Sequence, residues 1–199
     1  MKSIPKFAFT MLTATLLLAA LPTEMEAMIY DDTVRLHILA NSDSQSDQEL
    51  KLEVRDLLLN EYGEILKKTE SKSEAEDTIK ALLEDMSTRA EEFVRDAGYK
   101  YSVKATLSRE WYDTREYEGF SLPAGYYTSL RVIIGNGNGQ KWWCVMYPPM
   151  CMGLACEESP ADDGIIDYTS EEIHLIKSGK YNIKFKILEE LSRAFAKSG

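Results

Sequence analysis

The sequence predicts an α+β fold: a single domain at residues 28–199, with helices packed on one face of a mostly antiparallel sheet. Two observations support this prediction. Apolar residues recur with helical period along two long stretches between residues 46 and 97, and they alternate with polar residues along shorter stretches. The predicted order is β-α-α-β-β-β-α, which favours helices and strands in separate layers. A chain of 199 residues is enough for one domain with a full core.

Residues 1–27 are predicted to lie outside this domain. Lys2 and Lys6 form a short basic region, and residues 7–21 form a run without charge. As a helix this run would span only about 22 Å, short of a hydrocarbon core of roughly 30 Å. A secretory signal peptide is therefore favoured over a membrane span or a buried N-terminal helix. Neither Ala27 nor the small residues before it form a clean cleavage pattern, so the segment could also persist as an uncleaved anchor.

The first strand is predicted over residues 33–41. Its alternation gives one apolar face and a more polar face that carries Arg35 and His37. A polar turn follows, and then a helix that begins with a capping box of Ser46 and Glu49. The apolar stripe of this helix consists of Leu50, Val54, Leu57, Leu58, Tyr62 and Ile65.

A second helix is predicted from Ser73, which forms a capping box with Glu76, to Gly98, which ends it. The strict alternation of residues 99–107 then predicts a half-buried strand. The apolar stripe of the helix consists of Ala75, Ile79, Leu82, Leu83, Met86, Ala90, Phe93, Val94 and Ala97.

The C-terminal part is predicted to form a hairpin, a loop and a last helix. Residues 126–134 and 140–147 are interpreted as antiparallel strands joined by the turn Gly135–Gly139, whose glycines and asparagines tolerate positive φ. The acidic residues 157–168 are interpreted as a loop. The last helix is marked by Ile183, Ile187, Leu188, Leu191 and Phe195.

The charge of the chain excludes several classes of function. The formal net charge is −10, and removal of residues 1–27 leaves it unchanged, because that segment holds two lysines and two glutamates. Sequence-independent binding to nucleic acid needs clustered Lys and Arg, and anionic lipid headgroups also repel an acidic domain. A protein partner or a small polar substrate remains.

The three cysteines lie close together, which in an exported protein usually indicates a disulfide. We expect Cys144 to pair with Cys151, because Pro148-Pro149 between them can fold the chain back on itself. Cys156 is then left over. Reduced, buried thiols are the alternative, and the spacing does not fit a zinc site. A nucleophile pair of Cys144 and His37 would need a free thiolate in an oxidising compartment, so it is not favoured.

Two further binding patterns are weak. The loop Gly135–Gly139 is followed by a strand, whereas a phosphate-binding loop opens a helix. Asn41, Asp43 and Asp47 offer oxygens near a helix N-terminus, but the glycine and the glutamate of a calcium loop are missing, which favours turn and capping roles. We expect no catalytic residues, no metal and no cofactor.

Aromatic residues are the remaining candidates for function. Trp142 and Trp143 are adjacent on a strand, so they must face opposite sides of the sheet. One can enter the core, and the other needs a cover or a partner. The region is either a well-covered core or a binding patch, because exposed Trp and Tyr are frequent anchors of interfaces. It also contains Trp111, Phe120, Tyr126, Tyr127 and Tyr147.

Two segments make the chain resemble the stage II sporulation protein R family over residues 33–152. They are RLHILANSDSQSDQELKLEVRD (residues 35–56) and PAGYYTSLRVIIGNGNGQKWWCVMYPPMC (residues 123–151). In the second, Lys141 departs from the small polar residue expected there, and Cys156 lies outside the pattern.

The resemblance implies a secreted signal of endospore formation without assigned catalysis. Members of the family are exported into the space between the forespore and mother-cell membranes. There they trigger a membrane-embedded aspartic protease of the mother cell to process a sigma-factor precursor. The competing expectations are a secreted hydrolase and a cell-wall or glycan-binding module. The candidate partner-binding residues are His37, Asn41, Asp43, Arg55, Arg131, Trp142 and Trp143, and the candidate disulfide joins Cys144 to Cys151.

Overall fold

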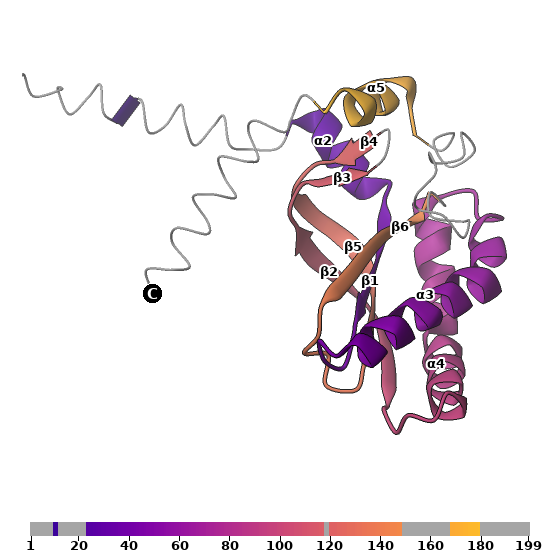
Figure 1. Cartoon of the computed structure of the whole chain (residues 1–199). Coiled ribbons are helices and arrows are strands. Elements are labelled where there is room, and N and C mark those ends of the chain that lie inside the picture. Colours follow the sequence, from indigo (N-terminus) through magenta and orange to yellow (C-terminus); the bar gives the residue numbers. More distant parts are fainter. Residues whose placement is uncertain (1–9, 12–22, 118–119, 149–167, 180–199) are drawn as a thin grey trace, which may run out of the picture.

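The structure is a computed structural model, and it describes residues 10–11, 23–117, 120–148 and 168–179 (Figure 1). The predicted last helix and Cys151 and Cys156 lie outside these residues. The helices are α2 (Glu24–Asp31), α3 (Gln45–Leu66), α4 (Lys72–Asp96) and α5 (Ser170–Ser178). The strands are β1 (Val34–Leu39), β2 (Val103–Tyr112), β3 (Arg115–Tyr117), β4 (Phe120–Leu122), β5 (Gly125–Ile134) and β6 (Lys141–Tyr147).

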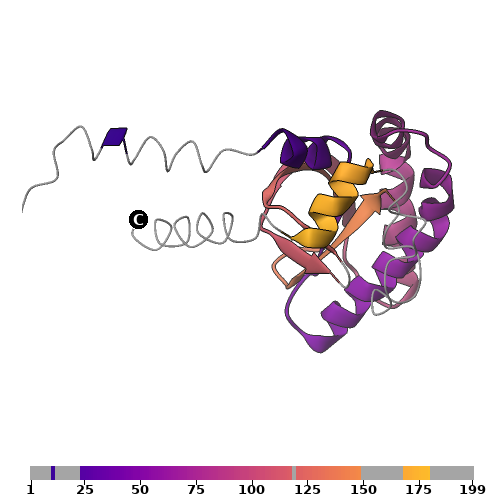
Figure 2. The same ribbon diagram turned by 90° about the horizontal axis from the view of Figure 1, so that it is seen from above.

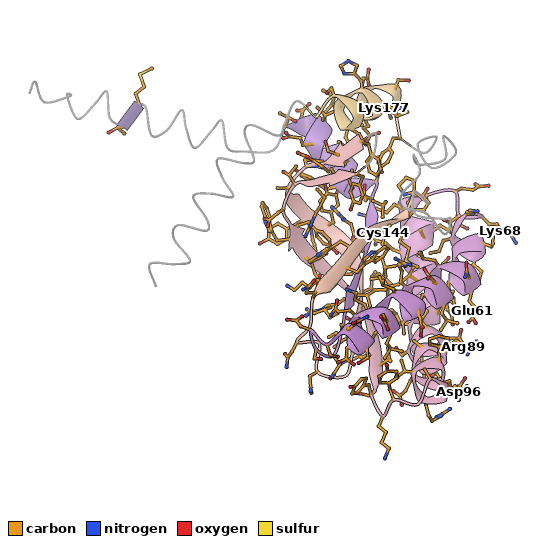
Figure 3. All side chains as sticks on the ribbon, in the orientation of Figure 1. Glu61, Lys68, Arg89, Asp96, Cys144 and Lys177 are labelled. Carbon is orange, nitrogen blue, oxygen red and sulfur yellow. The ribbon has the colours of Figure 1, made fainter. Side chains whose placement is uncertain are left out.

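The predicted α+β class is confirmed. The main sheet has the order β2-β5-β1-β6, and only the β1–β5 pair is parallel. The helices α3 and α4 cover one face of this sheet (Figures 1 and 2). Alternate residues of the strands enter the core on this face, where Leu36 and Ile38 are fully buried. On the outer side of the helices, Arg89 of α4 and Glu61 of α3 form an ion pair of 2.7 Å (Figure 3).

The opposite face of the sheet carries a second, smaller core. It is built from α2, α5, β4 and the ends of β2, β5 and β6. Ile29 of α2, Tyr127 of β5 and Ile176 of α5 are among its buried residues. The short elements α2, α5 and the β3–β4 pair are not predicted by the sequence pattern. The boundary expected at residue 27 falls within α2, so this helix begins before the expected start of the domain.

The predicted hairpin of residues 126–147 is wrong, because β1 lies between β5 and β6. The two strands do run antiparallel to one another, but each pairs with β1. The loop Gly135–Gly139 therefore crosses the end of β1 and does not make a tight turn. There Gly139 N donates to Ala40 O (2.9 Å), and Asn138 N donates to Asn41 O (3.3 Å).

Both long helices begin earlier than predicted. Ser44 and Ser71 are the N-caps, and their hydroxyls accept the N–H groups of Asp47 and Glu74, each at 3.2 Å. Several serines in each polar run can serve as caps, and the periodicity does not select among them. The predicted end of α4 is confirmed, since Gly98 follows it with φ of +90°.

The predicted strand of residues 99–107 is shifted. Tyr99 and Tyr101 alternate as in a strand, but they lie against the start of α3, where the Tyr99 hydroxyl donates to Ser46 O (3.5 Å). The strand itself begins at Val103. Among the described residues, no helix is both long and apolar enough to cross a bilayer.

Candidate functional site

The predicted partner-binding residues separate into three groups. His37, Arg131 and Trp143 meet on the sheet face that α3 and α4 leave free. Arg55 and Trp142 lie together on the helical side, and the guanidinium carbon of Arg55 is 5.0 Å from the centroid of the Trp142 ring. Asn41 and Asp43 belong to the connection between β1 and α3.

Asn41 and Asp43 fasten the loop that crosses the end of β1. Asn41 Oδ1 accepts Asn136 N at 3.0 Å, and Asp43 Oδ1 accepts Gln140 N at 2.7 Å. The amide of Asn41 also donates to Asp47 Oδ2 (2.9 Å). Burial favours a raised pKa for Asp47, but hydrogen bonds from Ser42, Asn41, Tyr101 and Ser44 outweigh it and lower the pKa. These polar groups are therefore engaged within the fold.

His37 is paired with a carboxylate at the centre of the free sheet face. His37 is 3 % exposed, and its Nδ1 lies 2.8 Å from Glu110 Oε2 of β2. Burial lowers the pKa of His37, and it outweighs the opposite effect of Glu110. We therefore assign a neutral imidazole that donates from Nδ1 to an ionised Glu110. Arg131 lies 3.5 Å from the other oxygen of Glu110. The polar face predicted for β1 is thus buried, because Glu110 and Trp143 cover it.

Trp143 covers the His37 ring. Their centroids are 3.7 Å apart and their planes are 14° from parallel. Tyr112 meets Trp143 edge to face at 4.8 Å. The cationic groups of Arg115 and Lys141 lie 5.4 and 5.7 Å from the centroid of the Trp143 ring. In a protein of net charge −10, these cations and Arg131 make a local basic surface around an aromatic ring.

Arg35 is the residue whose role the sequence analysis missed. Its side chain is fully buried on β1 and donates to the Tyr117 hydroxyl. The guanidinium carbon lies 4.2 Å from the Tyr112 ring centroid and 5.1 Å from that of Tyr127. Within the described residues, Nε and Nη1 have no hydrogen-bond partner. Its signal in the sequence is a charge within the strand, on the face that the alternation predicts to be the more polar one.

The two adjacent tryptophans face opposite sides, as predicted. Trp142 packs against the core under α3 and α4, and Trp143 packs against the second core. Both are partly buried. The large exposed aromatics within the described ranges are instead Trp111 and Tyr126, which are 49 % and 55 % exposed. They are cross-strand neighbours on β2 and β5, with centroids 5.2 Å apart.

The geometry contradicts a nucleophile pair of Cys144 and His37, on which the hydrolase alternative was built, and gives no support to the glycan alternative. Cys144 pairs with Leu36 in the register and belongs to the core under α3 and α4, whereas His37 faces the other side of the sheet. Cys144 is also 1 % exposed, so its sulfur is closed to solvent. The exposed rings of Trp111 and Tyr126 are inclined by 73°, so they do not form the coplanar platform expected of a glycan binder.

Comparison with known proteins identifies relatives. Residues 30–156 match the family model described as "Stage II sporulation protein R (spore_II_R)". A relative of that name from Bacillus subtilis (strain 168) is 36 % identical over 124 residues. The match covers 62 % of this chain and 55 % of the relative, so the chain spans about half the length of the curated protein that it matches. No solved structure matches.

Proposed function

Because the chain belongs to the stage II sporulation protein R family, we propose that it is an exported signal of endospore formation. In this proposal it acts between the forespore and the mother cell and activates a membrane-embedded aspartic protease, which then processes a sigma-factor precursor. Family membership is the observation that carries the proposal. The sheet face around His37 is consistent with it, because that face offers a basic, aromatic surface.

Recognition of a protein partner, and not catalysis, is the proposed mode of action. A histidine that acts as a general base must direct its unprotonated nitrogen at the reacting group. In His37 this nitrogen, Nε2, is buried and has no hydrogen-bond partner among the described residues. Trp143, with Lys141 and Arg115 beside it, supplies the kind of contact that anchors interfaces. Arg131, with a side chain 39 % exposed, borders the same surface.

Export and a disulfide are further parts of the proposal. Residues 1–27 direct the chain across the membrane, either as a cleaved signal or as a lasting anchor, and Cys144 pairs with Cys151 in the exported protein. Mass spectrometry of unreduced peptides tests the pairing. We expect a peptide that joins residues 144 and 151. Two free thiols, or a peptide that joins Cys151 to Cys156, contradict it.

Processing of the sigma-factor precursor in sporulating cells tests the function. A strain that lacks its own family member should recover processing when it expresses the full chain. Deletion of residues 2–21 should abolish recovery, and an unrelated signal peptide in their place should restore it. Processing by the deleted chain, retained in the cytoplasm, contradicts export as the mechanism. No recovery with the full chain, shown to be folded and exported, contradicts the proposed function.

A further inference from the structure

The outer edge of β2 is capped along one half and open along the other. β2 is the terminal strand of the sheet (Figure 1). At its start, Val103 N donates to Glu91 Oε2 (3.0 Å) and Ala105 N donates to Ser87 Oγ (2.9 Å), and both acceptors belong to α4. Side chains of the helix therefore satisfy the outward N–H groups of the first half of the strand.

The outward N–H groups of the second half have no such acceptor. Because N–H directions alternate along a strand, Leu107, Arg109 and Trp111 point the same way as Val103 and Ala105. None of these three N–H groups has a hydrogen-bond partner in the part of the chain that the structure describes. A terminal strand with free backbone groups is a template for pairing with another strand.

The side chains along this open edge favour a particular partner. Arg109 and Trp111 lie two residues apart and project from the same side of β2. Both are exposed, and Trp111 packs on Tyr126 with a centroid distance of 5.2 Å. Arg109 has no ion pair with any described residue. The open edge thus presents a free cation beside an exposed aromatic pair, in a domain that is otherwise acidic.

We propose that Leu107–Trp111 binds an extended segment of a partner protein as a fifth strand of the sheet. The backbone of this segment bonds to the open edge, as in β-strand addition. One of its carboxylates faces Arg109, and an apolar side chain two positions away packs on Trp111 and Tyr126. The partner segment therefore carries an acidic and an apolar residue with one residue between them.

A second copy of this chain is a less suitable occupant. Antiparallel pairing of two copies around Arg109 places the two guanidinium groups directly opposite one another, and like charges in that position destabilise a sheet. A segment with a carboxylate at this position has the complementary charge. The geometry therefore favours a different protein over self-association.

Proline variants separate backbone pairing from other effects. Arg109→Pro removes an outward N–H, and an edge strand tolerates proline where the N–H faces solvent. Arg109→Ala removes the charge and keeps that N–H. Ser108→Pro is the control for damage to the fold, because the N–H of Ser108 points towards β5 and its loss breaks the ladder. We expect thermal melts to show a small shift for the two Arg109 variants and a large one for Ser108→Pro.

Selection from a random heptapeptide display library, on the folded full chain, tests the edge without any assumption about function. Enriched peptides should carry an acidic and an apolar residue two positions apart. Their affinity should fall at least tenfold for Arg109→Pro, and by less for Arg109→Ala. Unchanged binding to Arg109→Pro, or no enrichment, overturns the proposal. A concentration-dependent dimer that Arg109→Pro abolishes overturns it in favour of a second copy.

A second experiment rests on the proposed function. In sporulating cells, Arg109→Pro and Arg109→Glu should reduce precursor processing at least tenfold at equal protein level. Lys104→Glu, an equal charge reversal on the capped half of β2, should leave processing unchanged. If the wild-type chain supports processing and Arg109→Pro does so equally, the edge proposal fails and the function stands. If the wild-type chain does not support processing, the function fails and the peptide selection alone decides the edge.

Discussion

His37 and Trp143 lie face to face on neighbouring strands, with ring centroids 3.7 Å apart and planes within 14° of parallel. The indole shields one side of the imidazole, and Glu110 bonds to its Nδ1. The histidine is thus kept neutral by burial, although a carboxylate is within hydrogen-bond distance. The pKa of His37 therefore reports directly on how well this face of the sheet is shielded from solvent.

Trp143→Ala should raise the pKa of His37, because burial is the largest cause that lowers it. It should also cost about 2–3 kcal/mol of unfolding free energy, somewhat less than a fully buried ring. Trp142→Ala is the matched control: it should cost a similar amount but leave the pKa of His37 unchanged, because Trp142 lies on the other face. NMR titration of the imidazole and urea unfolding measure both effects. Equal pKa shifts in the two variants contradict the assignment.

Arg35→Met should leave the unfolding free energy unchanged, or raise it by up to about 2 kcal/mol. A buried charge with few hydrogen bonds carries a desolvation cost, and an apolar side chain of similar size avoids it. Arg35→Ala removes the same charge but leaves a cavity among the tyrosines, so it should cost about 2–4 kcal/mol. Urea unfolding of both variants is the measurement. A loss in Arg35→Met as large as that in Arg35→Ala would mean that contacts of the guanidinium stabilise the fold.

Gly139→Ala should cost about 2–3 kcal/mol, because the added methyl group collides with the backbone oxygen of Ser42, which cannot move independently of the fold. Gly98→Ala provides the comparison. Gly98 has φ of +90° and nothing within 4 Å of an added Cβ, so it should lose only about 1 kcal/mol, from the backbone conformation. Chemical unfolding should rank Gly139→Ala well below Gly98→Ala in stability. Equal losses would show that the loop moves away from β1 without penalty.

Asp32→Asn should stabilise the protein at neutral pH and not at acidic pH. Burial and the neighbouring Glu172 carboxylate raise the pKa of Asp32. A raised folded-state pKa means that the stabilising contribution is complete below the unfolded value of about 3.9 and is lost as pH rises through the folded value. The amide removes that loss.

The measurement for Asp32 is the melting temperature between pH 3 and pH 8. Asp31→Asn, at the exposed neighbouring position, is the comparison and should change the pH profile less, because the charge of Asp31 raises the pKa of Asp32 less than burial and Glu172 do. A pH profile for Asp32→Asn that runs parallel to that of the wild type contradicts the proximity of Asp32, at the end of α2, to Glu172 of α5.

Periodicity predicted the elements whose side chains alternate between one core and solvent. The stripe of α4 includes Ile79, Met86 and Val94, all buried as expected. The apolar stripe predicted for α3 was less accurate, because Ile65 is exposed and Leu66 is buried in its place. The short helices α2 and α5 were missed because each contributes only a few residues to the second core, too few to establish a period.

The order of strands could not be predicted from local pattern. A glycine-rich loop between two strands is typical of a hairpin, and nothing within residues 126–147 indicates that β1 enters between them. The burial of Arg35 and His37 could not be predicted for the same reason. Both residues were assigned to a polar face because their cover comes from distant elements, among them Tyr112 on β2 and Trp143 on β6.

The position of β1 also has a consequence for how the protein is made. This strand is synthesised before every other strand, yet its two neighbours, β5 and β6, come last in the sheet. Until residue 147 has emerged, the apolar segment VRLHIL has an open edge on at least one side, and such long-range pairing makes folding slow. A nascent chain of this kind stays unfolded, which suits the proposed export, but it is exposed to aggregation and needs protection meanwhile.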